Sequence, residues 1–243
     1  MKNIDNWFPT KYHKYNGSLR SSRNIRQVSA GSRFMVDLLA EKFDKCIPEY
    51  CNGKLLDLGC GHVPLYEAYN DHVDEIVCVD WAFSHHSNNY LDLEQDISQP
   101  LRLKNEIFET VILSDVLEHL RNPTEVCKEI SRVMRIDGYL IVSVPFMYWL
   151  HEEPHDYYRY TKYGLTDILT SNGFEIVELH SCGGGLDVIV DIFSKLVVRL
   201  PVIGNYLAIV MSVLFGKISK IVSTKSDSKF PLFYFVIAKK TSR

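Results

Sequence analysis

An apolar strand followed by a glycine-rich turn and a helix, at residues 54–69, restricts most strongly what this chain can fold into. The segment reads KLLDLGCGHVPLYEAY: the strand ends in Asp57, a tight turn runs from Gly59 to Gly61, and we expect the helix to begin near Pro64. Glycines in such a turn let a ligand approach the main chain, and a helix start offers unpaired N–H groups. A turn of this kind at the carboxyl end of a strand predicts a small-molecule site in an open α/β sheet.

The rest of the chain alternates short β-rich runs with helical stretches, which is typical of parallel β–α–β units. Strands are predicted at residues 54–58, 75–80, 109–114, 138–144, 175–180 and 232–240. Helices are predicted at residues 33–46, ending near Pro48, at 123–135, and at 165–172 before Gly173. We therefore predict an α/β fold with a mostly parallel sheet and helices on both faces.

Residues 1–50 precede this alternation, and we interpret them as a basic N-terminal arm with a cap helix. Asp5 is the single acid among the first 33 residues, whereas lysine, arginine and aromatic residues recur there. Such an arm fits either a lid over substrate phosphates or a solvated face. Residues 51–243 are predicted to form one catalytic domain.

An apolar helical insertion is predicted at residues 183–230, before the last strand. Residues 200–216 carry no charge and are flanked by lysines and an arginine, but Pro201 and Gly204 weaken a straight helix. Within the insertion, residues 186–222 could dock peripherally on an anionic membrane. The alternatives are a helical pair packed on the core, a homodimer contact and a true membrane span.

Composition narrows the class of partner and the compartment. The net charge of −3 argues against a nucleic-acid partner, for which a strongly basic domain is expected. The six cysteines include no C-x-x-C pair, and the N-terminus has no apolar signal region. We therefore expect reduced thiols and a cytoplasmic protein. Any peripheral membrane contact is expected at the inner face of the cytoplasmic membrane.

The glycine-rich turn does not fit a dinucleotide site, because Pro64 replaces the third glycine of that fingerprint. Together with Asp80 at the end of the next strand, DLGCG resembles the first two motifs of class I S-adenosylmethionine-dependent methyltransferases of the type 11-like group. DIS, ILSDVLEHL and MRIDGYLIVSVPF follow in the order of that family. The resemblance implies a Rossmann-like fold with a seven-stranded sheet, S-adenosylmethionine as cofactor, and methyltransferase activity.

The resemblance also implies roles for the acids at the strand ends. Asp57 organises the turn under the methionine part of the cofactor and faces its amino group. Asp80 accepts hydrogen bonds from both ribose hydroxyls, and Asp96 bonds the adenine amino group with Ile97 against the ring. Asp92 is an alternative to Asp96. Ser114 and Asp115 border the sulfonium end, and His119 lies near the cofactor. The implied cofactor-binding residues are Asp57, Gly59, Cys60, Gly61, Asp80, Trp81, Asp96, Ile97, Ser114, Asp115 and His119.

HEEPH at residues 151–155 matches the H-E-x-x-H pattern of zinc proteases. That geometry needs His151 and His155 on one helical turn, and Pro154 between them disrupts a helix. We therefore predict that this site binds no metal. The stretch instead reads as the acceptor loop, with His155 as the first candidate for a general base, His151 as the second, and Asp156 orienting one of the reacting groups. A solvated loop is the alternative.

The run PHDYYRYT, followed by GLTDILTSNGF, resembles methyltransferases of bacterial polysaccharide and sugar modification. That resemblance implies O-methylation of a sugar or a cell-surface glycan precursor. A lipid-soluble small molecule such as a quinone is an alternative acceptor. A non-catalytic protein that only binds S-adenosylmethionine is an alternative from a different class.

Overall fold

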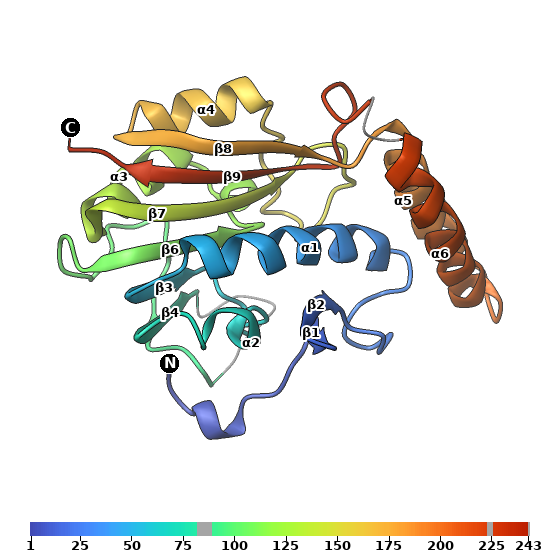
Figure 1. The fold of residues 1–243 in the computed structure, drawn as a ribbon, viewed down its shortest axis with the longest axis horizontal. Coiled ribbons are helices and arrows are strands. Elements are labelled where there is room, and N and C mark those ends of the chain that lie inside the picture. The colour runs from blue at the N-terminus through green and yellow to red at the C-terminus, as the bar shows by residue number, and fades with distance from the viewer. Residues whose placement is uncertain (82–88, 223–225, 243) are drawn as a thin grey trace.

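Figure 1 shows the chain in a computed structural model that describes residues 1–81, 89–222 and 226–242. The α-helices are α1 (Arg33–Tyr50), α2 (Tyr66–Tyr69), α3 (Pro123–Val133), α4 (Lys162–Thr170), α5 (Gly185–Val197) and α6 (Gly204–Val222). The short 3₁₀ helices are η1 (Ile4–Asn6) and η2 (Leu117–His119). The strands are β1 (Tyr12–Tyr15), β2 (Ser18–Ser21), β3 (Lys54–Leu58), β4 (Glu75–Asp80), β5 (Leu93–Glu94), β6 (Phe108–Ser114), β7 (Met134–Pro145), β8 (Phe174–Cys182) and β9 (Phe233–Lys240).

The main sheet has seven strands in the order β5-β4-β3-β6-β7-β9-β8. The five strands from β5 to β7 run parallel, whereas β9 is antiparallel to both of its neighbours. The order of the parallel strands reverses between β3 and β6, which is where open α/β sheets bind ligands. The predicted Rossmann-like, mostly parallel sheet is confirmed, and the carboxyl ends of its parallel strands point to the right in Figure 1.

Alternate side chains of the central strands pack on opposite faces of this sheet. Ile112 of β6 lies in one apolar cluster with Phe43 of α1. Val111 and Leu113 of the same strand lie in a second cluster with Ile130 of α3. Because a strand alternates its side chains with a period of two, β6 is buried on both sides. Helices therefore cover both faces, as the sequence predicts and Figure 1 shows.

Several helix ends differ from their predicted positions; α4, predicted at residues 165–172, spans Lys162–Thr170. α1 continues through Pro48 to Tyr50, because a proline in the last turn removes only one main-chain hydrogen bond and the turn still closes. α3 ends at Val133, whereas the sequence predicted a helix to residue 135. Met134 already pairs with Phe108 of β6, so the pairing of β7 with β6 replaces the last half-turn of the helix.

The N-terminal arm contains a β-hairpin that we did not predict. Tyr12–Tyr15 and Ser18–Ser21 pair in antiparallel register around Asn16 and Gly17, whose φ angles are 50° and 80°. Positive φ at both central residues is the signature of the tight type I′ turn, for which Asn-Gly is the preferred sequence. Tyr12 is buried, so the hairpin is packed against the body of the protein.

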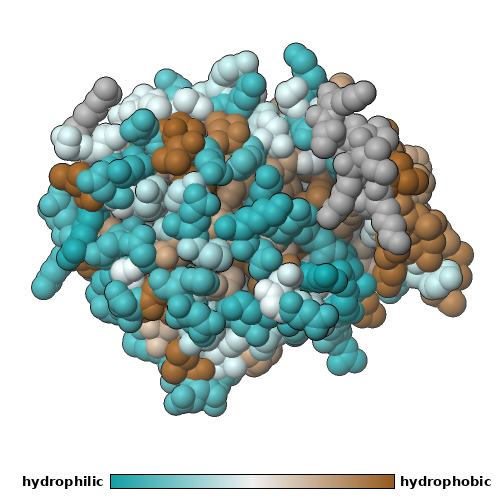
Figure 2. Space-filling view, in the orientation of Figure 1, coloured by the Kyte–Doolittle hydropathy of each residue, from teal (hydrophilic) through white to brown (hydrophobic). Residues whose placement is uncertain are grey.

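The predicted apolar insertion is a pair of helices, α5 and α6. On α5, charged side chains face inward and apolar side chains face solvent. Its buried side carries Asp187, Asp191 and Lys195, whereas Ile192 and Phe193 are 49% and 51% exposed. The brown area on the right of Figure 2 covers the position of the two helices in Figure 1. Apolar residues normally turn inward on a helix, so this face is an exposed apolar patch of the kind that marks an interaction surface.

A membrane-spanning helix is not found in the described parts of α5 and α6. Among the residues that the structure describes, none of the helices has both the length and the apolar character that such a span requires. The inward side of α5 agrees with this result, because Lys195 forms a buried ion pair with Asp191 and its Nζ lies 3.6 Å from the ring centre of Tyr148.

All six cysteines lie in described segments, unpaired and buried. Burial raises the pKa of the thiols of Cys51, Cys127 and Cys182 to about 12. The predicted reduced state is consistent with this packing, since each thiol lies among apolar side chains.

Candidate active site

The glycine-rich turn joins β3 to the short helix α2 at the carboxyl edge of the sheet. Gly59 has a φ of 74°, and its N–H donates to the carbonyl of Val79 on β4 at 2.8 Å. A Cβ atom built on Gly59 would lie 2.6 Å from Cγ2 of Val116, so only glycine fits this turn. The predicted helix start near Pro64 is in fact a single turn that begins at Tyr66.

Asp57 lies beneath this turn as a buried carboxylate. Its Oδ2 accepts a hydrogen bond from the Tyr69 hydroxyl at 2.9 Å. Burial raises the pKa of Asp57 to about 7; the Tyr69 hydrogen bond opposes the rise and the charge of Asp80 adds to it. A carboxylate with so little compensation would be stabilised by a cationic group of a ligand. The amino group of the methionine part of S-adenosylmethionine is such a group.

Asp80 is held at the end of β4 by two main-chain donors. Its Oδ2 accepts from the N–H of Gly61 and its Oδ1 from the N–H of Trp81, both at 2.7 Å. The two bonds fix the plane of the carboxylate at the strand end, between the glycine turn and the next loop. This is the position from which a carboxylate can bind both hydroxyls of a ribose.

A cavity of about 360 Å³ lies between Trp81, which follows Asp80, and the loop of residues 94–102. Trp81 and Asp96 line it together with Glu94, Gln95, Gln99, Pro100 and Arg102. Its volume falls in the range of small-ligand pockets. Ile97 is buried in the apolar cluster and supports this loop from below instead of lining the cavity.

Asp92 and Asp96, the two alternatives for the adenine contact, have different partners in the structure. Asp92 accepts a hydrogen bond from the N–H of Cys78 at 2.8 Å and so ties the loop to β4. Asp96 Oδ1 accepts from the N–H and the hydroxyl of Ser98, and its side chain lines the cavity. These contacts favour Asp96 as the residue that meets an adenine ring.

The residues of this edge fit S-adenosylmethionine as a set. The turn at Gly59 leaves no room for a side chain. Asp57 is a buried carboxylate that a cationic group of a ligand would stabilise, and Asp80 is oriented so that it can bind the two hydroxyls of a diol. The cavity beside Trp81 takes the remaining part of the cofactor. Methionine, ribose and adenine would then lie along the carboxyl ends of β3, β4 and β5 in that order.

The end of β6 borders the same edge. Ser114 Oγ lies 3.1 Å from Ser143 Oγ of β7, and Ser143 Oγ donates to Asp115 Oδ1 at 2.8 Å. Asp115 has a φ of 54°, which turns the chain away from the sheet directly after the strand. The two predicted residues therefore lie together where the strand ends.

The N-terminal arm closes over this end of the site. Lys11 Nζ forms an ion pair with Asp115 Oδ2 at 3.2 Å. A second cavity, of about 430 Å³, lies between the arm and the glycine turn and is lined by Phe8, Thr10 and His62 among others. Lys11 was not among the predicted site residues, because its partner is distant in the sequence.

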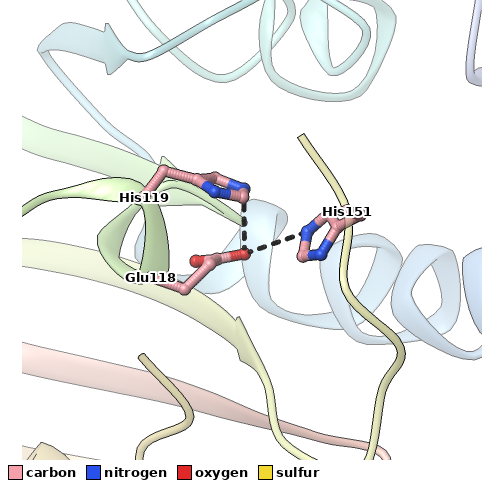
Figure 3. Close-up of side chains that lie close together, drawn as sticks. All are labelled: Glu118, His119 and His151. Carbon is pink, nitrogen blue, oxygen red and sulfur yellow. Dashed lines mark ion pairs between the residues drawn. The ribbon is translucent and has the colours of Figure 1, made fainter. Parts of the chain in front are cut away.

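Three side chains meet beside the end of β6, as Figure 3 shows. Glu118 and His119 belong to η2, and His151 belongs to the loop after β7. One oxygen of Glu118, Oε1, lies 3.6 Å from Nε2 of each histidine. The two rings are 4.7 Å apart between centres. Glu118 is fully buried, and burial raises the pKa of its carboxyl while the facing imidazoles oppose that rise.

The loop after β7 is tied to η2 by main-chain bonds. The N–H groups of Tyr157 and Tyr158 donate to the carbonyl of Glu118 at 2.9 and 3.2 Å. The carbonyl of His155 lies 2.9 Å from His119 Nδ1. These bonds explain why His151 reaches Glu118 although the loop is irregular. Residues 151–155 form no helical turn, as Pro154 led us to expect.

The predicted catalytic residues occupy different positions within this loop. Asp156 is held by both terminal nitrogens of Arg159, at 2.5 and 2.7 Å, and accepts from the N–H of His151. Burial acts to raise the pKa of Asp156, but Arg159 and His151 outweigh it and lower the pKa to about 2. His155 Nδ1 lies 2.9 Å from the hydroxyl of Tyr157, and its ring stands edge-on to Trp81 with centres 5.6 Å apart. His155 is thus the loop histidine that contacts the predicted cofactor side.

Glu118, like Lys11, is a site residue that sequence reasoning missed. It lies within the run DVLEHL, where an acid between apolar residues was read as part of a strand-end motif. The available signal was a charged residue beside a histidine in an otherwise apolar run, which indicates a buried and therefore functional carboxylate.

The pattern of one protein family matches most of the region just described. The family is described as "Methyltransferase domain", and its match covers residues 29–179, well over half of the chain. No protein of curated function matches the chain in sequence.

Solved structures with the same fold include two enzymes of the same description. A methyltransferase dependent on S-adenosylmethionine from Archaeoglobus fulgidus is 18% identical with a TM-score of 0.55, over 85% of this chain and 93% of its own. One from Mesorhizobium loti is 12% identical with a TM-score of 0.52, over 82% and 97%. The [4+2]-cyclase SpnF is 16% identical with a TM-score of 0.56, over 96% and 88%. At such identities the likeness shows the fold alone.

Proposed function

We propose that this chain, which belongs to the methyltransferase domain family, transfers a methyl group to an oxygen of a sugar or a cell-surface glycan precursor. The chain is an enzyme, an S-adenosylmethionine-dependent methyltransferase. The observation that carries the proposed acceptor is the loop after β7, where His151, His155, Tyr157 and Arg159 lie half-buried beside the cofactor edge. That density of donors and acceptors suits a ligand with many hydroxyl groups.

The chemistry needs alignment first and a base second. The cofactor supplies a methyl group on a positive sulfonium: the new O–CH₃ bond forms as the S–CH₃ bond breaks, and sulfur keeps the electron pair. Holding both reactants in line can be worth about 7–11 kcal/mol. A sugar hydroxyl is weakly acidic, so removal of its proton needs a group within hydrogen-bonding distance. His155 takes this role in the proposal, since its ring adjoins Trp81 at the cofactor edge. His151 is the second candidate, and Asp156 positions it.

An acceptor screen tests this proposal. Labelled S-adenosylmethionine is incubated with nucleotide sugars, glycans and quinones, and we expect label in a sugar or glycan. His155→Ala should lower kcat by about 10²–10⁴-fold, the usual contribution of a general base, and leave cofactor affinity unchanged. His180→Ala is the matched control, because His180 pairs with Glu178 on β8 outside the site.

Two results would contradict the acceptor proposal. Label found only in a quinone would replace the glycan by a lipid-soluble acceptor, which the exposed apolar face of α5 also suits. Full turnover by His155→Ala would remove that residue as the base. Label lost to water alone, with cofactor bound, would favour the non-catalytic binding protein.

The α5–α6 hairpin supports a peripheral contact with the cytoplasmic membrane surface in this proposal. Ile189, Ile192, Phe193 and Leu196 are each about half exposed and recur at helical spacing, so they form one stripe along α5. Lysines at residues 217, 220, 225 and 229 follow the apolar run. An apolar stripe followed in the sequence by lysines suits an anionic lipid surface. The hairpin lies on the same side as the carboxyl ends of the parallel strands in Figure 1, so a docked enzyme would face a membrane-held acceptor.

Flotation with anionic vesicles measures this contact. We expect the wild type to float and the double variant Ile192→Gln, Phe193→Gln to stay in solution. Substitution is preferable to deletion, since removal of α5 would uncover Tyr148 and break the buried pair of Lys195 with Asp191. Tyr163→Ser is the control, because Tyr163 is an exposed aromatic residue on α4. Equal flotation of all variants would contradict docking, and a halved molecular mass of the double variant would show a homodimer contact instead.

A further inference from the structure

Within the segments that the structure describes, the carboxylate of Glu118 is buried without a hydrogen-bond partner. Its side chain is 0% exposed, and neither carboxylate oxygen has a hydrogen-bond partner among the residues that the structure describes. The imidazole nitrogens of His119 and His151, at 3.6 Å, lie beyond a good hydrogen bond. A buried carboxylate in this state costs free energy unless a cation or a donor compensates it.

The two histidines both turn their Nε2 atoms toward this carboxylate. A carbonyl oxygen only accepts hydrogen bonds, so the 2.9 Å contact with the carbonyl of His155 places the proton of His119 on Nδ1. His151 Nδ1 lies 3.2 Å from Asp156 Oδ2, so the other nitrogen of that ring also faces a carboxylate. His119 Nε2 therefore has a lone pair available for an ion beside Glu118, and His151 Nε2 has one when the proton of that ring lies on Nδ1. Metal-binding histidines are oriented by such outer contacts to a carbonyl or a carboxylate.

From this arrangement we infer that Glu118, His119 and His151 bind one divalent transition-metal ion, such as Zn²⁺ or Co²⁺. An ion held at about 2.1 Å in tetrahedral geometry separates its ligand atoms by roughly 3.4 Å. The two separations from Glu118 are 3.6 Å, and all three ligand atoms lie within 4.8 Å of one another. Rotation of the two rings would bring the three ligand atoms onto one ion.

The donor set selects the class of ion. Two imidazoles with one carboxylate suit borderline ions, whereas Mg²⁺ and Ca²⁺ prefer oxygen ligands. Three protein ligands leave a further position for water or a substrate oxygen. The side chains of His119 and His151 are 17% and 23% exposed, so one side of the set is open.

This site differs from the metal site that HEEPH suggests and from the metal-free site predicted from the sequence. The sequence pattern would pair His151 with His155, but the fold pairs His151 with two residues of η2. The role of the ion rests on the proposed function: a metal-bound acceptor hydroxyl loses its proton more readily, so His155 could remove it. Metal binding itself does not depend on that function.

Metal titration tests the inference. Tag-free protein is treated with a chelator, dialysed and titrated with Co²⁺ by visible absorption and with Zn²⁺ by calorimetry. We expect one equivalent of each to bind, and an excess of Mg²⁺ not to displace them. Glu118→Gln keeps the shape of the side chain, and His151→Ala removes a partly exposed ligand. Each should weaken binding by more than the roughly 10–100-fold that loss of an outer contact costs, and Asp156→Asn should fall within that range.

Two controls make the result decisive. His180→Ala removes a histidine that pairs with a glutamate on β8, so it should bind the metal as the wild type does. Calorimetry with S-adenosylhomocysteine reports on folding of each variant, independently of the acceptor. The inference would be overturned if the wild type bound no stoichiometric ion, or if Glu118→Gln and His151→Ala bound the metal as tightly as the wild type does. The cluster would then be a histidine–carboxylate charge pair. Metal binding without turnover on any acceptor would instead count against the proposed function alone.

Discussion

Asp80→Ala should lower the affinity for S-adenosylhomocysteine by about 10²–10⁴-fold in calorimetry. The carboxylate is fixed by the N–H groups of Gly61 and Trp81 at 2.7 Å, in the position that we assign to the ribose. Each hydrogen bond to a charged group contributes about 1.5–3 kcal/mol, and two of them give about 3–6 kcal/mol. The variant also loses the anchor of the glycine turn, so the loss should lie toward the upper end.

The control for this experiment is Asp74→Ala. Asp74 is an exposed acid directly before the amino end of β4, at the other end of the strand that carries Asp80. It should leave the affinity unchanged. Undiminished binding by Asp80→Ala would show that the cofactor does not use this strand end, and the assignment of the cavity beside Trp81 would fall with it.

Gly59→Ala should lower the free energy of unfolding by about 2–5 kcal/mol and abolish cofactor binding. A side chain at a φ of 74° costs about 1–2 kcal/mol of backbone strain. The added Cβ would also lie 2.6 Å from Val116 Cγ2, and overpacking of this kind costs about 1–3 kcal/mol. For a chain of this length the thermal midpoint should fall by roughly 5–15 °C.

Two further variants separate strain from overpacking. Gly17→Ala places alanine at a φ of 80° with no atom within 4 Å, so it should show the backbone strain alone. Val116→Ala combined with Gly59→Ala should recover the part of the loss that comes from overpacking. Equal losses for Gly17→Ala and Gly59→Ala would mean that Val116 moves aside freely, and the close packing of η2 on the turn would then carry no energy.

The parts of the molecule that the sequence predicted are those whose signals are local. KLLDLGCG places an apolar strand, an acid and a tight turn within a few residues, and Asp80 ends the next apolar run. The order of these segments fixes a parallel sheet, since strands that alternate with helices have few other topologies. The Asn16–Gly17 turn was equally local, and the hairpin around it was predictable from the same rules.

The histidine cluster was not predictable because its members come from distant parts of the chain. Glu118 and His119 follow β6, whereas His151 follows β7, and only the parallel pairing of β6 with β7 brings the two strand ends together. Within HEEPH the spacing of His151 and His155 suggested a pair, yet the two rings turn to different partners. A sequence shows which residues could bind a ligand. Whether those residues lie close together depends on how the loops that carry them pack in the fold.

The burial of all six cysteines gives the protein a surface without reactive thiols. Only the thiolate reacts with alkylating reagents, and in the folded protein all six sulfur atoms belong to buried side chains. Reaction of the native cysteines with such a reagent would therefore report unfolding, and the rate of that reaction would measure the rate of unfolding. Ile192→Cys would provide the one accessible thiol, so a fluorophore placed there would sense water or lipid at the face of α5 without removal of any native cysteine.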